Sequence, residues 1–571
     1  MSQQKNEEVA NILYEIADLL ELKGIQFKPQ AYRNAARNIK SLSESIENLY
    51  LNEELRGIPG VGESIASKIK ELLETGKLQY LEDLRKEFPN HLQDLLNIQG
   101  LGPKRLMKLY KELDIKNLED LEKAIKNEEI QKIEGFGKKS EETILKGIQL
   151  YKESQKRFLL GDILPIALEL KNMLITQKAT KKVEIAGSIR RRKETIGDVD
   201  ILVVSDKPQE IMDFFVNLEI VNRVLSKGLT RSSVITEKNL QIDLRIIEES
   251  SFGSALLYFT GSKEHNIKLR KIALERNWKL NEYGLRDRHK NEIIAQERED
   301  QIYKVLNMAY IPPELREDRG EIETAIENKL PKLIELSDIK GDLHIHTKWS
   351  DGENSIEEMA QKGIELGYQY LAICDHTKGL QIANGLDEDR ITEQFKEIDK
   401  LNEKLDEIEI LKGAEVNIDS NGKLDLNNSI LKELDVVIAS IHSGFKNTKQ
   451  KLTDRIITAM HNDYVNIIGH PTGRIIHQRE ALDLDLTEIF NVASDFGIHM
   501  ELNSYPNRLD LSDLNCRKAK NSDLKVVINT DAHNKTHMKY MELGVATAKR
   551  GWIEKTDVLN CLTLKKLKTL L

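Results

Sequence analysis

The last third of the chain repeats short apolar runs separated by amphipathic stretches. Seven such runs begin at positions 341, 371, 410, 436, 465, 498 and 526. This alternation predicts parallel strands joined by helices. Six of the runs end in His, Asp or Glu, and the sixth along the chain ends in Asn503. Because the strands of a parallel barrel converge at their C-terminal face, the pattern predicts a shared metal cluster and a metal-dependent hydrolase.

The candidate ligands of this cluster are histidines and carboxylates at or just after the run ends: His344, His346, Asp351, His376, Glu415, His442, His470, Asp531 and His533. The set exceeds what one ion needs, so about two or three Mn²⁺, Zn²⁺ or Fe ions are expected. Such ions polarise a phosphate and generate hydroxide near neutral pH. A purely structural role suits His461, His477, His499 and His537 better, because they lack the strand-end setting.

Residues 1–150 follow a different pattern, with amphipathic helical stretches joined by glycine turns. A motif of apolar-x-Gly-apolar-Gly begins at Ile58, Ile98 and Ile133. Its glycines let backbone N–H groups approach a phosphate, and the next helix N-terminus adds positive potential. The motif resembles the helix-hairpin-helix motif, which binds the DNA backbone without reading sequence. One copy could be a structural turn, but three copies predict DNA binding. The glycines concerned are Gly60, Gly62, Gly100, Gly102, Gly135 and Gly137.

Residues 155–247 switch to strand-like segments that carry acidic residues. Asp198 and Asp200 alternate onto one face of a predicted strand, and Asp243 lies on another. Three carboxylates can hold two divalent ions, one activating a 3′-hydroxyl and the other stabilising the leaving pyrophosphate. An isolated Asp-x-Asp is weak evidence. Together with Gly187-Ser188 and the arginines that follow, it predicts a nucleotidyltransferase.

Composition limits the remaining options. A chain of 571 residues is too long for one core, so several domains are expected. The net charge of −9 argues against a simple basic nucleic-acid binder, although residues 181–193 are locally basic. The three cysteines form no disulfide or metal pattern. No apolar stretch is long enough for a membrane span, and the N-terminus is polar, so a cytoplasmic protein is expected.

Residues 1–310 resemble the family X DNA polymerases, such as polymerase beta. The resemblance is carried by GSIRRRKETIGDVDIL at 187–202, QIDLR at 241–245 and YFTGS at 258–262. It implies that Asp198, Asp200 and Asp243 are catalytic ligands of Mg²⁺ or Mn²⁺. It also implies a nucleotide site formed by Gly187, Ser188, Arg191, Gly197, Tyr258, Phe259, Gly261, Asn266 and Arg270. Lys263 departs from an acidic residue of the animal enzyme, which puts base contacts there in doubt.

The amino-terminal segment is similar to this family's deoxyribose-phosphate lyase domain, through residues 27–33 and 58–68. The similarity places Lys68 at the Schiff-base position, where a lysine of lowered pKa can attack an abasic sugar aldehyde. Ser64 replaces a second lysine of the pattern, so a role of Lys68 in binding a 5′-phosphate stays open. The same similarity implies phosphate contacts by Lys28 and Arg33.

The C-terminal ligand set resembles the polymerase and histidinol phosphatase (PHP) domain, over residues 337–571. This domain is a distorted seven-stranded barrel with a trinuclear site. Every usual ligand position is filled, whereas degenerate copies that act as scaffolds lose ligands. Asn503 is expected either to orient substrate or to cap a loop. Arg474 and Arg508 are candidate phosphate contacts.

We therefore predict a multidomain protein: a helical helix-hairpin-helix N-terminal part, an α+β nucleotidyltransferase palm and thumb, and a C-terminal α/β distorted (β/α)7 PHP barrel. The expected domains are a lyase-like DNA-binding domain (1–82), helix-hairpin-helix fingers (83–154), palm (155–260), thumb (261–315), linker (316–336) and PHP domain (337–571).

The predicted function is a DNA polymerase that fills short gaps in base excision repair, with a metal-dependent 3′–5′ exonuclease in its PHP domain. An AP endonuclease activity of that domain is a further option. The expected partners are gapped or primer–template DNA and dNTPs, with no membrane, for a monomer in the cytoplasm associated with the nucleoid. Two alternatives make the PHP domain a small-molecule phosphoesterase or a structural module.

Overall fold

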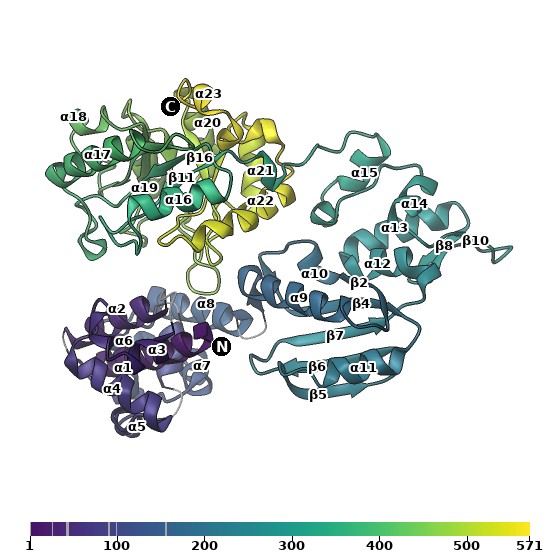
Figure 1. Cartoon of the computed structure of the whole chain (residues 1–571), viewed down its shortest axis with the longest axis horizontal. Coiled ribbons are helices and arrows are strands. Elements are labelled where there is room, and N and C mark those ends of the chain that lie inside the picture. Colours follow the sequence, from purple (N-terminus) through teal and green to yellow (C-terminus); the bar gives the residue numbers. More distant parts are fainter. Residues whose placement is uncertain (1, 26, 41–44, 90–91, 99, 155–156) are drawn as a thin grey trace. The chain divides into compact units, whose positions relative to one another are not determined.

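The structure, a computed structural model, describes residues 2–25, 27–40, 45–89, 92–98, 100–154 and 157–571. The chain forms two compact units (Figure 1). The first comprises residues 1–155 with the short segment 477–479, and the second comprises 156–476 and 480–571. The expected boundary at 154/155 adjoins residues 155–156, which lie outside the described residues.

The first unit is helical, and one apolar core runs through it from Val9 to Ile148. In α4, Ile65, Ile69 and Leu72 recur at helical spacing and are buried in this core. The core is continuous across residue 82, where two domains were expected to meet. Its helices are α1 (Ser2–Leu22), α2 (Lys28–Lys40), α3 (Ile46–Leu51), α4 (Glu63–Thr75), α5 (Gln79–Lys86), α6 (Pro103–Leu113), α7 (Leu118–Lys126) and α8 (Lys138–Ser154).

The first glycine of each of the three motifs lies in the same region of backbone conformation. Their first glycines, Gly60, Gly100 and Gly135, have φ of 78°, 94° and 80°, a region that favours glycine. Each second glycine directly precedes a helix, namely α4, α6 or α8. At Gly60 an added Cβ would also lie 3.3 Å from the backbone nitrogen of Ala35. Gln99, inside the second motif, lies outside the described residues.

The palm of the second unit is a five-stranded sheet in the order β2-β4-β7-β6-β5. α9 (Leu160–Ile175) and α11 (Pro208–Val216) pack in the core on one face, and α12 (Phe252–Thr260) packs on Leu202 and Val204 of the other. β4 and β7 are parallel, and their register pairs Asp200 with Asp243. The strands are β2 (Thr180–Ile185), β4 (Asp198–Ser205), β5 (Val221–Lys227), β6 (Arg231–Thr236) and β7 (Gln241–Ile246).

The thumb contains α13 (Lys263–Glu275), α14 (Glu299–Val305) and a sheet of β8 (Trp278–Asn281), β9 (Gly284–Asp287) and β10 (Ile293–Ala295). Residues 316–336, expected to be a linker, instead pack on the thumb and include α15 (Glu321–Ile326). Arg316 Nη1 donates to Glu299 at 2.6 Å, and Glu321 contacts His265 Nδ1 at 2.7 Å. The charges that suggested an exposed linker are thus partly buried in ion pairs.

The C-terminal part is a barrel of seven parallel strands whose spatial order follows the chain. A parallel bridge joins Ile345 of the first strand to Ala532, just after the last strand, so the barrel is nearly closed. This confirms the distorted seven-stranded barrel. The strands are β11 (Gly341–Ile345), β12 (Tyr370–Ile373), β13 (Glu409–Asn417), β14 (Val436–Ser440), β15 (Ile467–Ile468), β16 (His499–Asn503) and β17 (Val526–Asn529).

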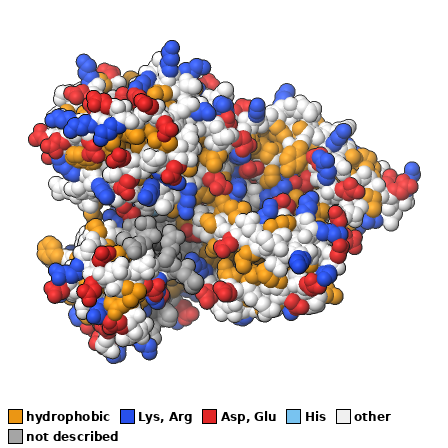
Figure 2. All heavy atoms as spheres, viewed as in Figure 1, with side chains coloured by type: hydrophobic (Ala, Val, Ile, Leu, Met, Phe, Trp, Pro, Cys, Tyr) orange, Lys and Arg blue, Asp and Glu red, His pale blue; other side chains and the backbone are white. Residues whose placement is uncertain are grey.

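The helices of the barrel region are α16 (Ile356–Glu365), α17 (Glu388–Asn402), α19 (Lys449–Met460), α20 (Leu486–Phe496), α21 (Asp513–Asn521) and α22 (Met541–Arg550), with short turns at α18 (Asn428–Leu431) and α23 (Leu564–Leu567). Figure 2 shows acidic and basic side chains interspersed over the visible surface of the barrel. Among the described residues, no helix is both long and apolar enough to cross a bilayer.

Candidate metal centres

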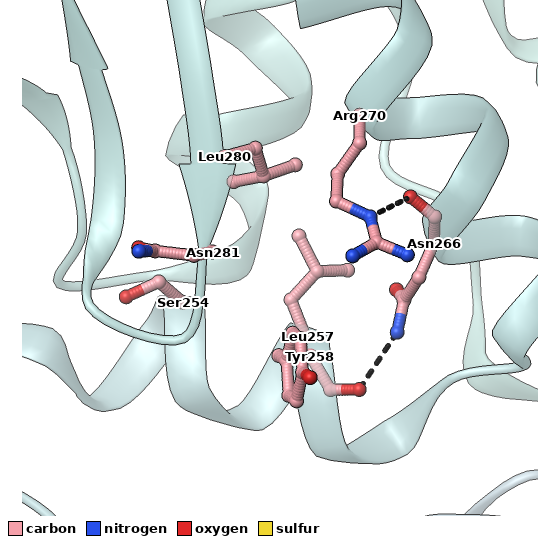
Figure 3. Close-up of a pocket in the computed structure, with 7 residues that line it drawn as sticks. All are labelled: Ser254, Leu257, Tyr258, Asn266, Arg270, Leu280 and Asn281. Atoms are coloured by element: carbon pink, nitrogen blue, oxygen red, sulfur yellow. Dashed lines mark hydrogen bonds between the residues drawn. The ribbon is translucent and has the colours of Figure 1, made fainter.

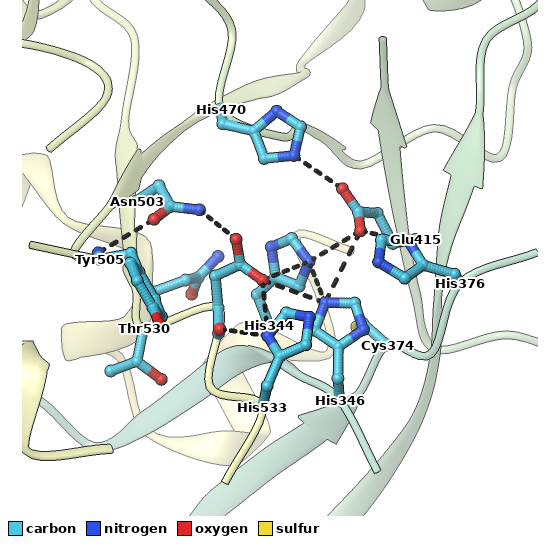
Figure 4. A network of polar contacts seen from close by, with 12 residues as sticks. His344, His346, Cys374, His376, Glu415, His470, Asn503, Tyr505, Thr530 and His533 are labelled. Atoms are coloured by element: carbon cyan, nitrogen blue, oxygen red, sulfur yellow. Dashed lines mark hydrogen bonds and ion pairs between the residues drawn. The ribbon is translucent and has the colours of Figure 1, made fainter. Parts of the chain in front are cut away.

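All nine residues expected as PHP ligands lie at the C-terminal end of the barrel, and the structure brings them together. They come from β11 and the loop after it, from β13, and from the segments that follow β12, β14, β15 and β17. Figure 4 shows His344, His346, His376, Glu415, His470 and His533 with their side chains gathered in one cluster. Convergence of parallel strands places these ligands together, as the sequence pattern predicts.

Glu415 is the centre of this cluster and is almost fully buried. Its carboxylate oxygens lie 2.8 Å from His376 Nδ1, 2.9 Å from His470 Nε2 and 3.2 Å from His442 Nε2. Nevertheless, Glu415 Oε1 and His376 Nδ1 have no hydrogen-bond partner among the described residues. Buried polar atoms that approach one another without hydrogen-bond geometry are what a shared cation would satisfy.

The ligand atoms form three overlapping groups, each with its atoms within 4.8 Å of one another. The groups are His346/Asp351/His376/His533, His344/His346/Asp531 and His376/Glu415/His442. His346 and His376 each belong to two groups, so the three candidate positions adjoin one another. Imidazole and carboxylate ligands fit divalent transition metals, and the residues present therefore suit a multinuclear site.

The electrostatics of the cluster favour cation binding. Burial alone would raise the pKa of Glu415, but His376, His442 and His344 hold that pKa well below its usual value. Burial, together with the positive charges of His533 and His376, lowers the pKa of His346 to about 3. Neutral imidazole and ionised carboxylate are the forms that ligate metal.

Sequence reasoning missed Glu501, which supports the ligands from β16. Glu501 is fully buried and lies 2.6 Å from His344 Nδ1, while the backbone N–H of His470 donates to it at 2.6 Å. A proton on His344 Nδ1 leaves Nε2 available for a metal. The signal was present, because Glu501 and Asn503 alternate onto the same face of one strand.

Asn503 acts within the same network. Its side-chain amide donates to Asp531 at 2.9 Å, and its Oδ1 accepts from the N–H of Tyr505 (Figure 4). Asn503 therefore orients a ligand. Of the two candidate arginines, Arg508 stays beside the cluster, with Nε 3.7 Å from Asp531. Arg474 instead pairs with Glu194 of the palm at 2.7 Å, so it packs the barrel against the palm.

The palm brings its three aspartates to neighbouring strands. Asp200 and Asp243 lie side by side in register, and Asp198 starts β4. Burial, together with the negative charges of Asp198 and Asp243, raises the pKa of Asp200 to about 7. Such mutual repulsion of carboxylates is what a bound divalent cation relieves. Gly187 has φ of +66°, and an added Cβ would lie 2.9 Å from Asp200 Oδ2, so the turn requires glycine.

Arg231 and Gln241 hold Asp243 in place, which sequence reasoning also missed. Arg231 Nη2 donates to Asp243 Oδ2 at 2.7 Å, and Gln241 Nε2 donates to Oδ1 at 3.2 Å. Arg231 reaches Asp243 because β6 pairs with β7, opposing Ser233 to Asp243. That pairing has no local sequence signal.

The expected nucleotide residues gather around the palm–thumb junction. Ser188 lies in α10 (Gly187–Arg190) and Gly197 directly precedes β4. Phe259 packs edge-on against Tyr258. Figure 3 shows one pocket lined by Tyr258, Asn266 and Arg270, together with Ser254, Leu257, Leu280 and Asn281. Asn266 Nδ2 donates to the Tyr258 carbonyl at 2.7 Å, which fixes it at the pocket wall.

The first unit carries the expected lyase residue. Lys68 Nζ donates to Ser64 Oγ at 3.0 Å and lies 4.7 Å from the Tyr80 ring centre. Burial lowers the pKa of Lys68, and the positive charge of Lys28 lowers it further. Arg33 is paired with Asp18 and Glu21, at 2.8 Å and 2.5 Å, so its charge is already compensated within the unit.

The fold and these two clusters define a class of protein, a nucleotidyltransferase joined to a metal-dependent phosphoesterase barrel. Family models match the same regions. Residues 4–78 match the helix-hairpin-helix domain and residues 92–149 the SAM-like helix-hairpin-helix tandem. Residues 255–317 match the DNA polymerase beta thumb, and residues 342–504 match the PHP domain.

Comparison with individual proteins extends this to the whole chain. The chain is 40% identical to DNA polymerase/3′-5′ exonuclease PolX of Bacillus subtilis (strain 168), over 567 residues that cover 99% of each chain. It is 34% identical over 230 residues to a probable phosphatase of Thermoanaerobacter sp. (strain X514), covering 38% of this chain and 89% of that one. DNA polymerase lambda of Rattus norvegicus is 25% identical over 336 residues, 53% of this chain and 54% of the relative. The chain belongs to the family X DNA polymerases that carry a C-terminal PHP domain, which confirms the resemblance.

Proposed function

We propose that this protein is a DNA polymerase that fills short gaps during DNA repair, and that its PHP barrel is a 3′–5′ exonuclease acting on the same DNA. The observation that carries the proposal is the presence of two complete ligand sets in one chain. One is the Asp198/Asp200/Asp243 trio on parallel strands, and the other is the nine-residue cluster of the barrel. The whole-chain similarity to a polymerase/3′-5′ exonuclease supports the same reading.

At the polymerase centre, Asp198, Asp200 and Asp243 would hold Mg²⁺ or Mn²⁺. When bound, these ions activate the primer 3′-hydroxyl and stabilise the leaving pyrophosphate. Arg231 orients the Asp243 carboxylate, which the strand pairing places beside Asp200. The dNTP triphosphate lies along Gly187, Ser188, Gly197 and Arg191. Tyr258, Phe259 and Gly261 line its sugar, and Asn266 and Arg270 contact the nascent pair and template.

At the barrel centre, the nine ligands would hold about two or three Mn²⁺, Zn²⁺ or Fe ions. When bound, the ions polarise the scissile phosphate and supply hydroxide. Glu501 and Asn503 keep His344 and Asp531 oriented toward the cluster. Arg508, at the edge of the cluster, would contact the substrate phosphate.

The first unit would bind gapped or primer–template DNA through its three glycine motifs. Their backbone N–H groups face phosphates without reading sequence, so binding extends to any gap. Lys68 would form a Schiff base with an abasic sugar, since its pKa is lowered by burial and by Lys28. We further propose a monomer that acts in the cytoplasm on nucleoid DNA, with domain limits as predicted from the sequence apart from the packed segment 316–336.

One alternative makes the PHP barrel a small-molecule phosphoesterase, because the region also resembles a probable phosphatase. An assay with labelled, unpaired primer DNA, Mn²⁺ and no nucleotides distinguishes the exonuclease from the small-molecule phosphoesterase. We expect shortening that His344→Ala abolishes and Asp198→Ala leaves intact. If wild type does not shorten the primer but hydrolyses a small phosphomonoester, the alternative holds. Shortening unaffected by His344→Ala would refute the assignment of the nuclease to the barrel.

A further inference from the structure

The barrel and the palm are packed together within the second unit. Leu509 and Leu543 of the barrel region belong to the same apolar core as the palm helix α9. At Gly161 of α9, an added Cβ would lie 2.7 Å from Pro506 Cβ, so the two parts touch without room for a side chain. The Arg474–Glu194 pair adds a polar contact. A packed apolar contact of this kind holds its partners in one arrangement.

At this interface, Arg550 of α22 reaches the palm turn that contains the expected triphosphate residues. Arg550 Nη1 donates to the backbone carbonyl of Arg191 at 2.8 Å and to Glu317 Oε1 at 2.9 Å. Its Nε and Nη2 donate to Asp513 at 3.1 Å and 2.9 Å. The Arg550 side chain is only 4% exposed, so these contacts are shielded from solvent and salt.

The side chain of Arg191 contacts Glu317, the same carboxylate that Arg550 contacts. Its Nε donates to Glu317 Oε1 at 3.0 Å, and its Nη1 donates to the carbonyl of Thr260. Glu317 Oε1 thus accepts from both arginines. No described residue accepts a hydrogen bond from Nη2 of Arg191. Two of the three guanidinium nitrogens are therefore held by protein acceptors, and a guanidinium held in this way is pre-organised for phosphate.

We propose that Arg550 of the PHP barrel is a positioning residue of the polymerase site. It fixes the backbone of Arg191 directly and the guanidinium of Arg191 through Glu317, and so sets the affinity for the dNTP triphosphate. The barrel would then be a structural part of the nucleotide site as well as a nuclease. This inference rests on the proposed role of Arg191 in binding the triphosphate.

The test is steady-state primer extension by the full chain, with KM for dNTP and kcat measured separately. Arg550→Ala is expected to raise KM by about tenfold, the loss typical of a hydrogen bond to a charged group, with kcat changed little. Arg550→Lys, which can still donate to one acceptor, should recover part of the effect. Lys549→Ala is the matched control, because Lys549 on the same helix contacts the exposed Glu335 instead. It should leave KM unchanged.

Arg191→Ala separates this inference from the proposed function. If Arg191→Ala raises KM and adding Arg550→Ala raises it no further, Arg550 acts through Arg191. If Arg191→Ala raises KM but Arg550→Ala does not, the inference is wrong and the proposed nucleotide site stands. If neither raises KM, the role of Arg191 itself fails. Should Arg550→Ala not fold, as judged by thermal melting, Glu317→Gln replaces it, with the same rise in KM expected and an unchanged KM refuting the inference.

Discussion

Replacing Glu501 with Gln is expected to weaken metal binding in the barrel without removing any ligand. Glu501 Oε1 faces His344 Nδ1 at 2.6 Å and Asn529 Nδ2 at 3.0 Å, while Oε2 accepts from the His470 N–H at 2.6 Å. Both oxygens therefore face donors, so a Gln amide NH₂ meets a donor in either orientation. Loss of such a supporting partner lowers metal affinity by about 10- to 100-fold. That range corresponds to about 1.4 to 2.8 kcal/mol.

The measurement is metal content by mass spectrometry after dialysis against buffered Mn²⁺, with an Mn²⁺ titration of nuclease activity alongside. We expect Glu501→Gln to need a 10- to 100-fold higher Mn²⁺ concentration for half-occupancy, by the same reasoning. His499→Gln is the matched control, since His499 shares β16 and its Nε2 has no partner among the described residues. If Glu501→Gln binds as much Mn²⁺ as wild type when Mn²⁺ is limiting, the Glu501 carboxylate does not support His344.

Three further predictions follow from the polymerase and lyase sites. Gly187→Ala should lower the rate of primer extension at least about tenfold, because strain at φ +66° and the contact with Asp200 displace the turn. Nuclease activity should be unchanged. Extension by Gly187→Ala at the wild-type rate would refute this prediction. Asp200 must lose its proton to bind metal, and its pKa is raised to about 7. The Mg²⁺ concentration that gives half-maximal primer extension should therefore rise about tenfold for each pH unit below that value. A half-maximal Mg²⁺ concentration that is the same at about pH 6 and pH 7 would contradict this prediction. Lys68→Ala should abolish borohydride trapping of abasic DNA and leave gapped-DNA binding largely intact, whereas an undiminished adduct would assign the lyase chemistry to another residue.

The barrel was predictable from sequence because each of its strands carries its own signal. An apolar run followed by a ligand-type residue is a local pattern, and parallel strands bring such ends together whatever lies between them. The glycine motifs were predictable for the same reason, since each positive φ is a local requirement for glycine. Both predictions depend on short segments of the chain.

The supporting residues were harder to predict because they depend on strand pairing and domain packing. Arg231 reaches Asp243 through the β6–β7 register, and Arg550 reaches Arg191 across an interface. The segment 316–336 has the polar, acidic composition that is typical of a linker. In the folded chain Arg316 and Glu321 are buried beside partners far from them in sequence.

The central claim is that one chain holds two distinct catalytic centres acting on the same DNA end. It is tested most directly by following a labelled primer in gapped DNA with Mn²⁺, before and after dNTPs are added. Wild type should shorten the primer and then extend it, Asp243→Ala should only shorten it, and His344→Ala should only extend it. If either variant loses both activities, or if both variants keep both activities, the assignment of the two activities to two centres is wrong.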